Sequence, residues 1–165
     1  MGDVPWIIFS PAKDYRVHKE AVEIITDDKY GSLWNVKAAD ILDDATMNLI
    51  FDAKERINAT YSPDKQMVEP EVMNSDISDT LVTKILMGTF GCVPAYDEFF
   101  QKGVRMYKIV GDNYTKPSLQ RLAKFYTEHE RTFEHVRWEI SRERGVEYPQ
   151  MKLVGMCFWQ IGIDV

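Results

Sequence analysis

Apolar side chains recur every three or four positions along residues 117–145, and this spacing constrains the fold more than any other feature of the sequence. Positions three and four residues apart share one face of an α-helix, whereas a strand alternates at every second residue. Pro117 suits the first turn of a helix and Gly145 its end. The segment therefore predicts one long helix, whose apolar face consists of Leu122, Phe125, Tyr126, His129, Phe133, Val136 and Ile140.

Other parts of the chain show the same helical spacing, whereas no alternation of strands with helices supports a parallel sheet. An apolar run at residues 4–9 predicts a short extended segment, and the two prolines within residues 62–76 predict a surface loop. We therefore expect an all-α protein, a mostly helical bundle of five to seven helices in one domain spanning residues 1–165. The further helices are expected at residues 15–31, 36–60, 78–91, 94–111 and 151–162.

Composition narrows the class of protein. A chain of 165 residues with 45% hydrophobic and 28% charged residues is typical of one soluble globular domain. No run approaches the ~20 apolar residues of a membrane-spanning helix, and the first residues do not resemble a signal peptide. We therefore expect a cytoplasmic protein without membrane contact. Cys92 and Cys157 lie in apolar surroundings without a CxxC pattern, which predicts two buried free thiols.

The motifs of the best-known cofactor and metal sites are absent. The chain lacks a Gly-rich phosphate loop, a GxSxG elbow, an HExxH pair and an EF-hand loop, so we expect no cofactor and no metal. His135 shares a helix face with Glu128 and Glu139, a row that is typical of a solvated surface and that could also hold a metal or exchange protons. His129 faces the apolar side and is expected in the core.

Charge is distributed unevenly along the chain. The balance of Lys and Arg against Asp and Glu is −9 over residues 1–100 and +3 over residues 101–165, which together make the net charge of −6. The acidic portion is a candidate surface for a basic protein partner, with Asp40, Asp43 and Asp44 as its proposed contacts. The basic stretch is a candidate phosphate-binding surface. Its proposed nucleic-acid-binding residues are Lys102, Arg105, Lys108, Arg121 and Lys124.

Trp138 lies about 180° from His129 around the expected long helix, and therefore opposite the apolar face. Two interpretations are open. The last helix covers Trp138, which we favour because an apolar helix must bury more than one face. Alternatively Trp138 is exposed among arginines and anchors a protein partner or stacks on a base.

Residues 84–100 carry the most distinctive pattern, an apolar helix ending at Phe90-Gly91, a link through Pro94, and Asp97 near the start of the next helix. This segment resembles the core of the helix-hairpin-helix DNA glycosylase superfamily. The resemblance implies that Asp97 assists the departure of a damaged base, with Phe90, Gly91, Pro94 and Phe100 as framework. The other interpretation is that Asp97 caps its own helix.

Two functions from different classes remain, and the sequence does not decide whether the protein is an enzyme. The first is a nucleic-acid-related helical protein, a degenerate glycosylase-like domain that binds DNA or RNA. The alternative is a non-catalytic interaction or inhibitor protein that presents its acidic N-terminal face to a basic partner. A small-molecule enzyme with a pocket beneath the loop at residues 62–75 is a third hypothesis, for which the residues name no reaction. The surroundings of Asp97 discriminate best between the first two.

Overall fold

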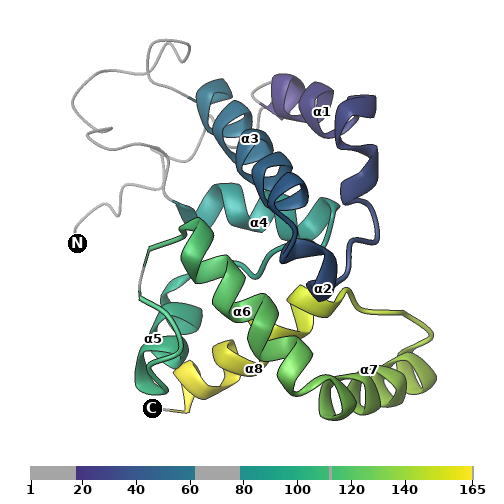
Figure 1. The fold of residues 1–165 in the computed structure, drawn as a ribbon, viewed down its shortest axis with the longest axis vertical. Coiled ribbons are helices and arrows are strands. Elements are labelled where there is room, and N and C mark those ends of the chain that lie inside the picture. Colours follow the sequence, from purple (N-terminus) through teal and green to yellow (C-terminus); the bar gives the residue numbers. More distant parts are fainter. Residues whose placement is uncertain (1–17, 62–78, 112, 165) are drawn as a thin grey trace, which may run out of the picture.

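The computed structural model describes residues 18–61, 79–111 and 113–164, and within these ranges the chain forms eight α-helices and one 3-10 helix, with no strand (Figure 1). The predicted all-α class is confirmed. The extended segment at residues 4–9 and the loop at residues 62–76 lie outside the described residues. The elements are α1 (Lys19–Ile25), η4 (Asp28–Leu33), α2 (Ala38–Ile41), α3 (Asp44–Thr60), α4 (Asp79–Thr89), α5 (Glu98–Met106), α6 (Lys116–Glu128), α7 (Glu130–Arg144) and α8 (Gln150–Ile163).

The helices exceed the expected five to seven because the structure adds two short elements and divides one long helix. The residues between α1 and α3 form η4 and α2, which are too short for a periodicity argument to detect. The helix expected at residues 117–145 ends at Glu128, and α7 starts at Glu130. His129 has φ −116° and ψ 19°, and its backbone closes α6 and opens α7.

The division at His129 changes which side chains are buried. α7 turns away from α6 (Figure 1), and Phe133 folds back to stack on Tyr126 with ring centroids 4.8 Å apart. Val136, expected on the apolar face, is 40% exposed. His129 is exposed rather than part of the core, although its Nδ1 lies 2.9 Å from the carbonyl oxygen of Phe125.

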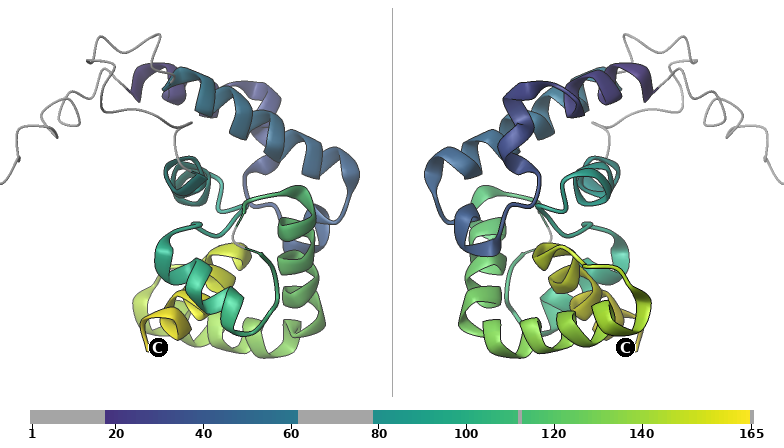
Figure 2. Two further views of the ribbon diagram at one scale, coloured as in Figure 1. Left: turned by 90° about the vertical axis from the view of Figure 1, so that its left-hand side faces the viewer. Right: turned by 90° about the vertical axis from the view of Figure 1, so that its right-hand side faces the viewer.

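The described helices form two groups, with α4 between them. Helices α1 and α3 pack together at one end of the molecule, α5 to α8 form the other end, and α4 lies between the two groups (Figure 2). Each of the described helices contributes at least one buried apolar residue to a single cluster that runs from Ala21 to Phe158. No helix in the described ranges is long and apolar enough to cross a membrane.

Helices α5 and α8 form the most extensive contact between two elements, and glycine makes it possible. A Cβ atom added at Gly103 would lie 1.9 Å from the carbonyl oxygen of Phe158, and one at Gly162 would lie 1.8 Å from that of Phe99. Each helix therefore contributes one glycine that lets the two backbones touch. This contact fixes the position of α8 beside the segment that carries Asp97.

Candidate functional site

Asp97 is the N-cap of α5. Its Oδ1 accepts a hydrogen bond of 3.1 Å from the backbone N–H of Phe100, and its Oδ2 lies 3.6 Å from Nζ of Lys84 on α4. Asn, Asp and Ser are preferred at this position because their side chains satisfy an otherwise unpaired N–H of the first turn. The structure therefore shows Asp97 as the cap of its own helix, and it adds an ion pair with Lys84.

The segment before Asp97 is held against α4 by threonine side chains. Oγ1 of Thr80 donates to the carbonyl oxygen of Tyr96 at 2.7 Å, and the N–H of Tyr96 donates to Oγ1 of Thr83 at 2.9 Å. Gly155 of α8 lies against Pro94 on the other side, because a Cβ there would be 3.2 Å from Cβ of Pro94. Residues 94–97 thus form the floor between α4 and α8.

A groove opens above this floor, with a cavity volume of about 360 Å³. Its surface is almost entirely apolar. The cations that line it are Lys84 and Lys152, and Asp97 is the lining carboxylate, so its formal charge is positive. We call this feature the α4–α8 groove, lined by Lys84, Met87, Ala95, Asp97, Lys152, Gly155, Met156 and Trp159.

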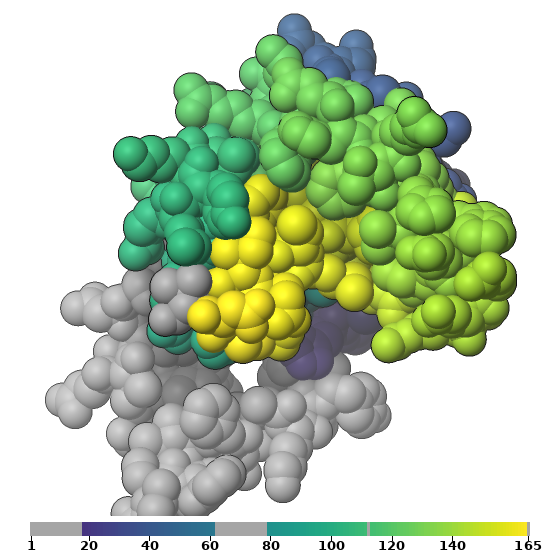
Figure 3. All heavy atoms as spheres, turned by 90° about the horizontal axis from the view of Figure 1, so that it is seen from below, coloured from purple at the N-terminus to yellow at the C-terminus, as the bar shows by residue number. Residues whose placement is uncertain are grey.

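Apolar surface continues from the groove along α8, which lies open between α5 and α7 when the molecule is seen from below (Figure 3). Met156 and Trp159 are each 40% exposed, although both are large and apolar. Phe99, at 42% exposure, meets Trp159 edge to face at 5.8 Å, and Ile163 next to this pair is also 42% exposed. Contiguous apolar patches on a protein surface usually mark an interaction site.

The predicted nucleic-acid-binding residues do not join Asp97 in this groove. Lys102, Arg105 and Lys108 are exposed on α5 and directly after it, and Arg121 and Lys124 are exposed on α6. None of the five lines the cavity beside Asp97. Lys124 lies 3.7 Å from Glu128 in an i,i+4 pair.

The predicted acidic contacts are exposed, and two of them also serve the backbone. Asp43 is the N-cap of α3 and accepts hydrogen bonds from the N–H groups of Ala45 and Thr46, and Asp40 accepts one of 2.9 Å from the N–H of Lys37. Asp44 lies in the first turn of α3, where a negative charge is stabilising.

Trp138 is 56% exposed, so the expectation that the last helix covers it is wrong. The reason is the turn at His129, which directs α7 away from the body of the bundle and leaves Phe133 as its single buried residue. His135 lies 3.6 Å from Glu139, and the described residues contain no group of three potential metal ligands. Cys92 is buried, and burial raises its pKa to about 12, whereas Cys157 is exposed, contrary to expectation.

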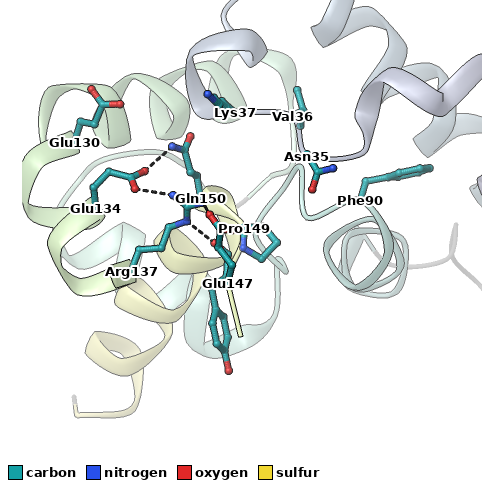
Figure 4. Close-up of a pocket in the computed structure, with 11 residues that line it drawn as sticks. Asn35, Val36, Lys37, Phe90, Glu130, Glu134, Arg137, Glu147, Pro149 and Gln150 are labelled. Atoms are coloured by element: carbon teal, nitrogen blue, oxygen red, sulfur yellow. Dashed lines mark hydrogen bonds and ion pairs between the residues drawn. The ribbon is translucent and has the colours of Figure 1, made fainter. Parts of the chain in front are cut away.

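A second cavity, of about 560 Å³, lies between α7 and the residues before α2 (Figure 4). Its wall contains a polar network centred on Glu134, which accepts hydrogen bonds of 2.7 Å from Tyr126 Oη, 2.7 Å from Gln150 Nε2 and 2.6 Å from Arg137 Nη1. Gln150 in turn accepts a bond of 2.7 Å from the N–H of Ala38. We call these residues the Glu134 network.

The Glu134 network holds helices together and leaves few of its own polar atoms for a ligand. Burial raises the pKa of Glu134, but the bonds from Tyr126, Gln150 and Arg137 outweigh burial and hold this pKa below its ordinary value. Arg137 also bonds Glu147 and the carbonyl oxygen of Tyr148. The donors and acceptors of these half-buried side chains thus satisfy one another.

Sequence reasoning missed both cavities. The spacing of Met156 and Trp159 places them on one helix face, and this spacing is the signal that could have indicated the exposed apolar surface of α8. Glu134 and Arg137, three residues apart, are recognisable as a helix pair. Gln150, their third partner, comes from another helix, and periodicity cannot reveal it.

No protein-family model matches this chain, and neither a curated protein nor a solved structure matches it.

Proposed function

We propose that this protein is a non-catalytic interaction domain that binds an apolar, carboxylate-bearing segment of another protein in the α4–α8 groove. The observation that carries the proposal is the combination of an almost wholly apolar lining with two lysines, Lys84 and Lys152, at one surface depression. Peptide grooves of this kind take apolar anchors, and flanking charges select among partners.

The side chains of the groove suit a protein partner. Methionine is flexible and polarizable, so Met87 and Met156 can adapt to an incoming side chain. Trp159, 40% exposed, is of the residue type that most often dominates binding energy at interfaces. An apolar side chain of the partner inserted between them would exclude water from surface that is now exposed. Burial of this apolar surface would stabilise the complex by roughly 25 cal/mol per Å².

The charges favour a carboxylate on the partner. The side chain of Lys84 is 51% exposed, and its Nζ lies 3.6 Å from Oδ2 of Asp97. A second carboxylate, from a partner, can join or replace Asp97 in this loose ion pair. The Nζ of Lys152 lies 4.7 Å from the ring centroid of Tyr148. Among the described residues, Lys152 forms no ion pair. The groove is positive, whereas the protein as a whole has a net charge of −6. The groove therefore attracts an acidic ligand, although the whole molecule attracts basic ones.

Catalysis by Asp97 has less support. One oxygen of its carboxylate is engaged by the N–H of Phe100 and the other by Lys84, and its neighbours in the groove are apolar side chains and Lys152. A general base needs reach to a proton and a pKa suited to the task, and a partner group normally supports it. Here Asp97 starts a helix, and its ion pair helps to orient Lys84.

The test uses two fluorescein-labelled helical peptides of 16 residues with the same leucine face, one flanked by glutamates and the other by lysines. Fluorescence anisotropy with the full chain should show tighter binding of the acidic peptide, although the protein itself is acidic. Trp159→Ala should weaken binding by roughly 30-fold, the usual loss at a dominant contact.

Charge reversal is the matched control. The double variant Lys84→Glu, Lys152→Glu should reverse the preference and bind the basic peptide more tightly, whereas Lys102→Glu, an exposed lysine of α5 outside the groove, should leave it unchanged. Equal binding of both peptides by the wild-type chain, or a preference that survives the double reversal, would contradict the proposal.

A further inference from the structure

Helix α7 presents a face that no described element covers. Of its 15 residues, Phe133 alone is buried. Advancing 100° per residue, the helix places Arg131, His135, Trp138 and Arg142 between about 140° and 200° from Phe133, so these four lie on the opposite side. We call them the α7 stripe. It runs about 16 Å along the helix axis, at 1.5 Å per residue.

The aromatic ring of the stripe is held by its neighbours. The guanidinium of Arg142 lies 4.7 Å from the ring centroid of Trp138, and the ring of His135 is inclined to it by only 17° with centroids 6.4 Å apart. Trp138 remains 56% exposed in this arrangement. A large aromatic ring is thus kept in place at the surface, where its ordering entropy is already partly lost before any ligand arrives.

Positive charge accompanies the ring. The stripe itself contains two arginines and a histidine and no acid. Around the helix axis, the acids of α7 nearest to it are Glu139 on one side, 3.6 Å from His135, and Glu134 on the other, which accepts hydrogen bonds from Tyr126, Arg137 and Gln150. A ligand that follows the centre of the stripe therefore meets two guanidinium groups and an aromatic ring, with carboxylates only at its edges.

We propose that the α7 stripe binds single-stranded nucleic acid, with a base stacked on Trp138 and phosphates bound by Arg131 and Arg142. Stacking on aromatic rings together with arginine contacts to phosphate is how proteins hold unpaired strands without selecting a sequence. A duplex keeps the faces of its bases stacked on one another, so an exposed ring on a convex helix suits an unpaired base. This site is separate from the α4–α8 groove and does not depend on its function.

An acidic protein segment would also meet the arginines of the stripe, and the geometry favours nucleic acid over it. Each charged or aromatic group of the stripe is planar: indole, imidazole and guanidinium. Planar cations and rings arranged in a row match alternating bases and phosphates, whereas carboxylates would pair with the arginines and leave the exposed part of the Trp138 ring in water.

The experiment measures binding of fluorescein-labelled decathymidylate to the full chain by anisotropy at 20 and 200 mM KCl. Trp138→Ala should weaken binding by roughly 5- to 160-fold, the range for loss of one stacked base, and Trp138→Phe should restore most of it. The matched control is Trp34→Ala, which removes an indole that is 50% exposed outside both proposed sites and should leave the affinity unchanged.

Two further measurements distinguish base stacking from electrostatic attraction alone: the salt dependence of binding, and competition by a polyanion that cannot stack. Neutralising Arg131 and Arg142 to glutamine should reduce the slope of log affinity against log salt by about 1.4, because each phosphate contact contributes about 0.7 for a single strand. A polyglutamate of ten residues should compete poorly. The proposal is overturned if decathymidylate does not bind at 20 mM KCl, if Trp138→Ala binds as the wild type does, or if polyglutamate displaces the oligonucleotide at equal concentration.

Discussion

At the scale of single residues, carboxylates that stand out in the sequence serve the backbone. Asp97 and Asp43 are both N-caps, and Asp40 accepts a backbone N–H in the first turn of α2. The physical reason is general, because each helix start leaves unpaired N–H groups that a short acidic side chain satisfies. The capping role is enough to explain why such an acid occurs at its position, without any catalytic or binding function.

Tyr114 shows the opposite situation, a polar atom without a described partner. Its ring is buried and stacks on Phe51 with centroids 4.9 Å apart, while its hydroxyl has no hydrogen-bond partner among the described residues. Burial raises the pKa of Tyr114 well above the ordinary value. A buried hydroxyl in this position costs free energy without returning a hydrogen bond.

We therefore expect Tyr114→Phe to raise the free energy of unfolding by about 1 kcal/mol. Tyr126→Phe is the matched control: it removes a hydroxyl that donates to Glu134 at 2.7 Å, and we expect a loss of about 1 kcal/mol. Urea unfolding followed by circular dichroism measures both. A loss of stability in Tyr114→Phe would mean that its hydroxyl has a partner after all.

At the scale of elements, the close contact between α5 and α8 shapes the α4–α8 groove. Backbone contacts at Gly103 and Gly162 bring the helices together, and α8 then positions Met156, Trp159 and Lys152 opposite α4. Small residues allow this because helix axes can approach more closely when no side chain intervenes. The groove therefore depends on two glycines that do not line it.

Gly162→Ala should lower the free energy of unfolding by about 2 kcal/mol or more, because the added methyl group would lie 1.8 Å from the backbone oxygen of Phe99, which has no room to move aside. Gly88→Ala, in α4 with nothing within 4 Å of the added atom, should instead raise it by about 0.5–1 kcal/mol through helix propensity. Thermal and urea denaturation compare the two. Similar effects from both substitutions would contradict close contact between α5 and α8.

At the scale of the whole molecule, the Glu134 network joins parts that are distant in the sequence. Tyr126 and Glu134 belong to α6 and α7, Gln150 starts α8, and Ala38 starts α2. The Glu134 carboxylate thus links α6, α7 and α8 directly, and α2 through Gln150. Removing one member of such a network leaves the other half-buried groups without a partner.

Acid should weaken the fold through this carboxylate. The pKa of Glu134 is lower in the folded than in the unfolded chain, so its contribution to stability is complete above the ordinary glutamate value of about 4.3 and is lost as the pH falls through the folded pKa. Urea unfolding between pH 2.5 and 7 should show this decline. In Glu134→Gln the chain should start from lower stability and decline less steeply, and an equally steep decline would contradict the assignment.

The turn at His129 separates what pattern can determine from what it cannot. No glycine or proline occurs between Ser118 and Arg144, so propensity alone favours one continuous helix there. The stack of Phe133 on Tyr126 and the bond from Tyr126 to Glu134 form because the chain turns at His129. Contacts across the turn therefore outweigh the local preference, and they expose Trp138 as a consequence.

The all-α class and the approximate places of the longer helices follow from local properties of the sequence: helical periodicity, caps, and glycine or proline stops. The sequence also indicated Trp138 and Asp97 as residues to examine. Three other features are seen only in the folded chain: Asp97 caps α5 beside an apolar groove, the predicted basic residues lie elsewhere, and Trp138 is exposed. These features depend on which helix faces pack together, and contacts between side chains far apart in the sequence determine that packing.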